Sequence, residues 1–110
     1  MPRRLAGVIN MQDLTVFYRS ERALFANRDT FYVIDLNAQT AFEASAFWAK
    51  MYIAEAGLPS NGNADDPSGG YELGSRIVYV VPTFRKSERA IANPIDFTGI
   101  CRQLDVALPA

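Results

Sequence analysis

The sequence predicts an α+β domain with two layers: a mostly antiparallel sheet of four or five strands, backed by two helices. Its length of 110 residues fits one domain, since domains commonly run to about 100–150 residues. Hydrophobic residues make up 49%, enough to build a core. Runs rich in β-branched and aromatic residues alternate with two segments of helical pattern. We therefore expect a single domain over residues 1–110, with a flexible loop at 58–72.

The first expected strands are residues 14–19 (LTVFYR) and 31–36 (FYVIDL), both rich in β-branched and aromatic side chains. Residues 22–26 form a middle strand in one interpretation. In a rival interpretation, residues 14–26 form one helix. That helix would place these apolar residues on a single face: Leu14, Phe17, Tyr18, Leu24 and Phe25. The sequence leaves both interpretations open.

The clearest expected element is a helix over residues 41–56. Thr40 and Glu43 have the spacing of a capping box, in which each side chain bonds a backbone amide at the helix start. Gly57 supplies a left-handed terminator, and Pro59 follows it. The surface of this helix is unusually apolar, as its large side chains show: Phe42, Phe47, Trp48, Met51, Tyr52 and Ile53.

A helix that is apolar on most sides normally has packing partners on most sides. In a chain of this size, one sheet covers only one face of it. We therefore expect a second copy of the chain to cover the rest, and the protein to be a homo-oligomer.

The second half predicts one strand, a short return strand and a helix. Residues 76–82 (RIVYVVP) have the pattern of a strand buried on both faces, which Pro82 should end or mark as an edge. A charged turn is expected at 85–89 and a short strand at 90–92. Asp96 is a suitable N-cap for a helix near 96–107. Its apolar face would comprise Phe97, Ile100, Cys101, Leu104 and Leu108.

Residues 19–27 resemble residues 86–93, with one residue deleted. A duplicated strand-turn-strand-helix unit would produce this similarity, and so would chance. About eight matching positions are too few to establish a repeat, because repeat architectures need several copies.

The composition argues against most catalytic chemistry. The chain has no histidine, which removes the commonest general base and metal ligand near neutral pH. With a single cysteine, Cys101, neither an internal disulfide nor a Cys/His zinc site is expected. No phosphate-binding loop or dinucleotide fingerprint follows a strand. We expect no cofactor and no metal, and on balance no enzymatic activity.

The loop at 58–72 has some features of a calcium site. Asn61, Asn63, Asp65 and Glu72 stand at positions one, three, five and twelve of an EF-hand-like register. Position six is Asp66 where a sharp turn needs glycine. A strand, rather than a helix, is also expected to follow. A structural or solvated loop is the favoured interpretation.

Two candidate sites remain. Aromatic walls of a small-molecule pocket, between the sheet and the helices, could come from Phe47, Trp48, Tyr52 and Tyr79. Aromatics interleaved with basic residues suggest a nucleic-acid surface, with these candidates: Arg19, Arg22, Arg85, Lys86 and Arg89. The net charge of −1 speaks against a dedicated nucleic-acid binder.

The favoured function is a small, non-catalytic, cytoplasmic binding or accessory protein that acts as a homo-oligomer. The first alternative is a ligand-binding or enzymatic pocket between sheet and helices. The second alternative is nucleic-acid binding through the Arg and aromatic surface. No apolar run is long enough to span a membrane, so no membrane partner is expected. A protein or small-molecule ligand remains an open partner class.

Overall fold

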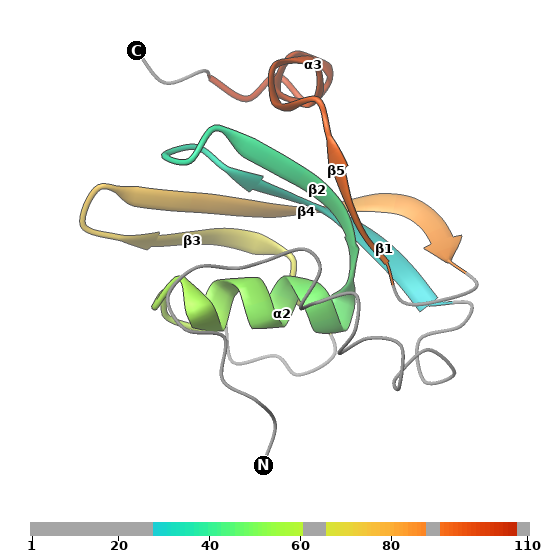
Figure 1. The fold of residues 1–110 in the computed structure, drawn as a ribbon, viewed down its shortest axis with the longest axis horizontal. Coiled ribbons are helices and arrows are strands. Elements are labelled where there is room, and N and C mark those ends of the chain that lie inside the picture. The colour runs from blue at the N-terminus through green and yellow to red at the C-terminus, as the bar shows by residue number, and fades with distance from the viewer. Residues whose placement is uncertain (1–27, 61–65, 88–90, 108–110) are drawn as a thin grey trace.

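The structure is a computed structural model that describes residues 28–60, 66–87 and 91–107. Along the chain lie β1 (Arg28–Asp35), β2 (Thr40–Ser45), α2 (Ala46–Glu55), β3 (Gly69–Leu73), β4 (Arg76–Ser87), β5 (Ala92–Ile95) and α3 (Phe97–Gln103). The five strands form one open antiparallel sheet in the order β3-β4-β1-β2-β5 (Figure 1). The predicted α+β fold, with a mostly antiparallel sheet of four or five strands and two helices, is confirmed, and the number of strands in the described residues is five.

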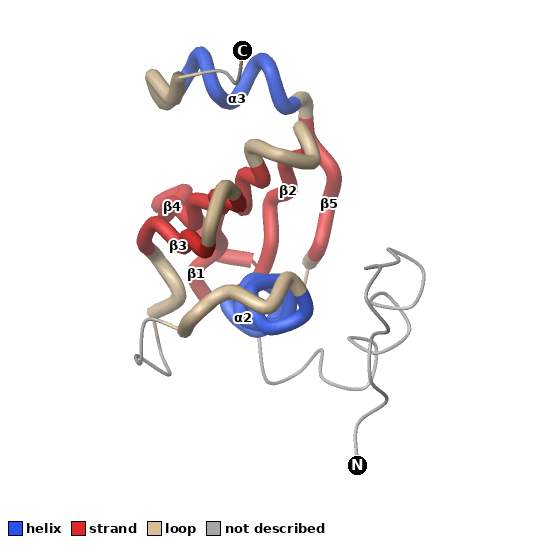
Figure 2. The backbone as a smooth tube through the Cα atoms, turned by 90° about the vertical axis from the view of Figure 1, so that its left-hand side faces the viewer, coloured by secondary structure: helices blue, strands red, loops and turns tan. Residues whose placement is uncertain are grey.

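The two helices lie on opposite faces of the sheet (Figure 2). Side chains alternate between the faces along each strand, so β1 sends Phe31 and Val33 toward α2 and Ile34 toward α3. Val78 and Val80 of β4 join the α2 side. The sheet therefore has one helix on each face, where a two-layer arrangement would place both on the same face.

The helix predicted at 41–56 begins later than expected, because Thr40–Ser45 forms β2 instead. The capping box predicted at Thr40 and Glu43 is wrong. The N-cap is Ser45, whose hydroxyl accepts a hydrogen bond from the Trp48 amide at 3.3 Å. Strand β2 pairs with β1 on one side and with β5 on the other. The hydrogen bonds of these two pairings override the local preference of residues 40–45 for a helix start. The predicted end is confirmed, with Gly57 at φ +74°.

The apolar surface of α2 is largely covered within the chain. Of its ten residues only Ala54 is exposed, and Phe42, which added to the predicted apolar surface, belongs to β2. Phe47 and Met51 pack against the α2-side core. The sequence-based reason for a second subunit therefore does not hold in its original form. The homo-oligomer stays a prediction that needs another surface.

Strand β4 is longer than predicted, because it continues through Pro82 to Ser87. Pro82 lies opposite Phe31 of β1, whereas pairing with β3 stops at Val80. A proline, which has no amide hydrogen to donate, is tolerated there because β4 no longer pairs with β3 at this position. Residues 85–87 are consequently strand rather than the expected charged turn. The return strand is β5, at 92–95 rather than 90–92.

The predicted N-cap of the last helix is confirmed, since the Asp96 carboxylate accepts a hydrogen bond from the Gly99 amide at 2.9 Å. The helix is shorter than the expected 96–107. It ends near Gln103, where Asp105 adopts φ +57° and the Val106 amide bonds the Cys101 carbonyl at 2.8 Å. The predicted apolar face packs on the sheet through Phe97, Ile100, Cys101 and Leu104.

The expected loop at 58–72 also needs correction, because Gly69–Leu73 forms β3. Glu72 is exposed on that strand, whereas residues 61–65 lie outside the described residues. The described part of the chain holds no group of three or more side chains suited to a metal. Several predictions lie wholly or partly outside the described residues: the elements at 14–26, the first half of the 19–27 and 86–93 similarity, and Leu108. In the described ranges, neither helix has the length and hydropathy needed to cross a bilayer.

Candidate functional site

The most unusual local geometry lies near the C-terminal end of β4. The pairing with β1 runs from Phe31 opposite Pro82 to Asp29 opposite Lys86. Three β4 residues, 83–85, therefore stand against the single residue Thr30, which makes a bulge. At its centre Phe84 has φ +62°, in the left-handed region that costs a non-glycine residue about 1 kcal/mol or more.

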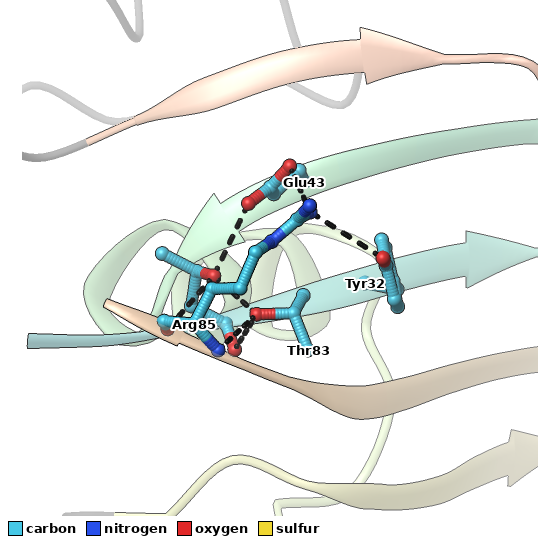
Figure 3. A network of polar contacts seen from close by, with 5 residues as sticks. Tyr32, Glu43, Thr83 and Arg85 are labelled. Atoms are coloured by element: carbon cyan, nitrogen blue, oxygen red, sulfur yellow. Dashed lines mark hydrogen bonds and ion pairs between the residues drawn. The ribbon is translucent and has the colours of Figure 1, made fainter. Parts of the chain in front are cut away.

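A polar network holds the bulge in place (Figure 3), and one of its members, Tyr32, packs on the α3 side of the sheet. The Arg85 guanidinium lies 2.7 Å from the Glu43 carboxylate and 6.0 Å from the centre of the Tyr32 ring. The Thr83 hydroxyl contacts the Thr30 hydroxyl and accepts a hydrogen bond from the Arg85 amide at 3.0 Å. The buried Thr30 hydroxyl also donates to Glu43 at 3.2 Å. These contacts tie β4 to β1 and β2, so the bulge is fixed by three strands.

The bulge turns the Phe84 side chain away from the core. Its exposed fraction is 93%, the higher of the two large exposed hydrophobic side chains among the described residues. Phe84 forms one wall of a concavity of about 510 Å³, which Phe31 and Pro82 also line. The remaining lining residues are polar: Asp29, Thr30, Asp66 and Lys86. We call the seven lining residues together the Phe84 surface.

The charges of the Phe84 surface are of both signs. Lys86 pairs with Asp29 at 2.7 Å, and both side chains are about two-thirds exposed. The Ser68 amide donates to the Asp66 carboxylate at 3.0 Å, and this hydrogen bond lowers the pKa of Asp66. The surface thus combines an apolar floor and wall with two carboxylates and one ammonium group.

The nucleic-acid candidates are only partly placed by the structure. Arg85 and Lys86 are neighbours on β4, and each is matched by a carboxylate at 2.7 Å. Arg19, Arg22 and Arg89 lie outside the described residues. The two described candidates are thus each paired with a carboxylate, and a nucleic-acid role for the five residues stays a prediction.

The four pocket candidates do not come together. Trp48 and Tyr52 stack in the core on the α2 side, with ring centres 5.2 Å apart, and Phe47 packs at the edge of that cluster. Tyr79 lies on the other face of the sheet, toward α3. None of the four lines the concavity at the bulge. The role of these residues in the described structure is packing, and a ligand role stays a prediction.

A buried carboxylate that sequence reasoning missed lies beneath α2. Asp35 is fully buried and accepts hydrogen bonds from the Tyr52 hydroxyl and the Arg76 guanidinium, each at 2.6 Å. Burial, reinforced by Asp35, raises the pKa of Tyr52 to about 12. With a guanidinium and a hydroxyl donating to it, this buried carboxylate links β1 to β4 and α2. The sequence did contain a signal for this burial. Residues two apart on a strand share a face, so Asp35 lies on the same inward face as Val33.

Sequence reasoning also missed the bulge and the exposure of Phe84. In the sequence Phe84 stands out only as an aromatic neighbour of Arg85, because one strand's sequence does not reveal how many residues its partner places opposite it. Comparisons with protein-family models, curated proteins and solved structures found no match to this chain. The functional argument therefore rests on the residues of the site.

Proposed function

We propose that the protein is a small, non-catalytic binding protein that acts as a homo-oligomer, and that the Phe84 surface is its contact surface. The observation that carries this proposal is Phe84 itself, 93% exposed in a bulge that other side chains hold. The cytoplasmic location stays a prediction.

Keeping Phe84 in this position is costly for an isolated chain. Burying a phenylalanine side chain contributes about 1.5–3 kcal/mol, which this residue forgoes, and its left-handed backbone adds strain. Strain of this kind concentrates at functional sites. Aromatic side chains that enter a pocket on a partner carry much of the binding free energy at protein interfaces. The network around Thr30 and Arg85 fixes the backbone of the bulge that carries Phe84 before any partner arrives, which reduces the backbone entropy lost on binding.

The edge of β4 supports recognition through side chains rather than added strands. In the described part of the sheet, β3 pairs with β4 only as far as Val80. Beyond that point Pro82 lacks an amide hydrogen, and the bulge at 83–85 disrupts the ladder. Both features hinder the docking of another strand. A partner is therefore expected to contact the Phe84 side chain and the concavity beside it.

The test is the molar mass in solution, measured by light scattering across micromolar concentrations. The wild type should exceed the 12.2 kDa of one chain, with a mass that grows with concentration. Phe84→Ser should return it to a single chain. Leu73→Ser is the matched control, because Leu73 is the other large exposed hydrophobic side chain among the described residues. It lies on β3 opposite Arg76, at the end of β4 that is remote from the bulge. A wild type of 12.2 kDa at every concentration would overturn the proposal.

The same concavity favours one second candidate, a small-molecule site. Its volume of about 510 Å³ falls within the roughly 300–1,000 Å³ of typical ligand pockets. This candidate predicts that apolar fragments raise the melting temperature of the wild type and not that of Phe84→Ser. A fragment screen with equal shifts for both proteins would contradict it.

A further inference from the structure

We infer that two copies of this chain meet at the Phe84 surface about a two-fold axis, with each Phe84 entering the concavity of the other copy and the Asp29–Lys86 pair exchanged between copies. This inference rests on the proposed function and deepens it, because it gives the symmetry of the contact and the side chains that are exchanged.

The first argument is that one patch carries both halves of an apolar contact. Phe84 projects from the bulge, and Phe31 and Pro82 form an apolar floor beside it. In a two-fold interface the same patch faces itself, so a side chain that projects from the patch must be received by the same patch of the other copy. An unrelated partner would need only one of the two halves. Their presence within a few residues of each other favours a second copy.

The second argument comes from charge. Asp29 and Lys86 stand opposite each other in the β1–β4 register and are about two-thirds exposed, so both remain accessible to a facing chain. A two-fold rotation can place the Lys86 of each copy against the Asp29 of the other. A partner bearing charge of a single sign would instead meet a like charge on this surface. The pattern is therefore complementary to itself.

The exchanged ion pair can be tested by charge reversal. If Asp29 and Lys86 only stabilised the fold of one chain, mixing two charge-reversed variants would not restore their association. In Asp29→Lys, two such copies would bring lysine against lysine. In Lys86→Asp, two such copies would bring aspartate against aspartate. When the two variants are mixed, the lysine introduced in one copy faces the aspartate introduced in the other. The native Lys86 of the first variant then faces the native Asp29 of the second, so both exchanged pairs have opposite charges again.

We expect the dissociation constant of each single variant to rise about tenfold or more relative to the wild type, as measured by sedimentation. The equimolar mixture should form a heterodimer, identified by its mass in native mass spectrometry. Glu72→Lys is the control for Asp29→Lys, because it changes the net charge equally on exposed β3, away from the Phe84 surface. It should associate like the wild type, and circular dichroism should show that every variant is folded.

The failures are distinguishable. A wild type that stays a single chain overturns the proposed function, and this inference with it. If the wild type associates and Phe84→Ser does not, but the mixture stays as weak as the single variants, the contact surface stands and the two-fold exchange is wrong. Single variants that associate as tightly as the wild type also overturn the exchange.

Discussion

At the residue scale, Asp35 shows how one buried charge is accommodated. The carboxylate is fully buried at the end of β1, and the Tyr52 hydroxyl, the Arg76 guanidinium and the Ala38 amide all donate to it. Arg76 is partly exposed, so only one end of the ion pair is withdrawn from water. The interaction links β1, β4 and α2. Removing one partner leaves a buried charge with fewer donors, which is the costly case.

Tyr52→Phe tests this interaction through its pH dependence. At neutral pH the lost hydrogen bond to Asp35 should lower the free energy of unfolding by about 1–3 kcal/mol. The folded pKa of Tyr52, about 12, lies above its ordinary value of 10.0. The stabilisation is therefore fully present below pH 10 and is lost as pH rises from about 10 to about 12.

Urea unfolding of both proteins, followed by Trp48 fluorescence, measures the difference. Tyr71 is present in both, so its own raised pKa cancels in the comparison. A wild-type advantage that stays constant from neutral pH to pH 12 would contradict this account of Asp35 and Tyr52.

At the scale of the element, local signals located both helices but fixed only one end of each, the C-terminal end of α2 and the N-terminal end of α3. The spacing of Thr40 and Glu43 is a genuine capping pattern, yet Glu43 instead faces Arg85 across the sheet. Ser45 caps α2 because β2 ends there, after pairing on both sides. The Asp96 cap was predictable because no competing ladder includes that residue. Sequence signals thus succeed where local and long-range preferences agree.

The capping side chain of Asp96 explains why a poor helix former, Gly99, stands in α3. A Cβ atom at Gly99 would lie 2.5 Å from a carboxylate oxygen of Asp96, so the capping side chain would have to move. Gly99→Ala should gain about 1 kcal/mol of helix propensity and lose about 1 kcal/mol of capping, for little net change in stability.

A double-mutant cycle separates these two effects. In the Asp96→Ala background the cap is already absent, so Gly99→Ala should stabilise the protein by about 1 kcal/mol in urea unfolding. Equal effects of Gly99→Ala in both backgrounds would show that the glycine does not protect the cap.

At the scale of the whole molecule, the sequence predicts a sheet with two helices because long β-branched runs and two helical patterns are strong signals. It does not predict the placement of one helix on each face or the bulge opposite Thr30, since both depend on pairing between distant segments. The sequence argument for a homo-oligomer depends on an uncovered apolar helix. The chain covers α2 itself and leaves Phe84 exposed instead. The candidate contact surface therefore lies at the end of β4 and not on a helix.

The most direct test of this surface is photocrosslinking from its centre. Phe84 is replaced by a benzophenone-bearing phenylalanine, and Leu73 is replaced in the same way as a control. Irradiation of the folded protein at micromolar concentration, followed by peptide mass spectrometry, should give covalent dimers joined from position 84 to residues 29–31 or 82–86 of another copy, whereas position 73 should give none. Dimers from position 73 alone, or no dimers from position 84, would contradict the account.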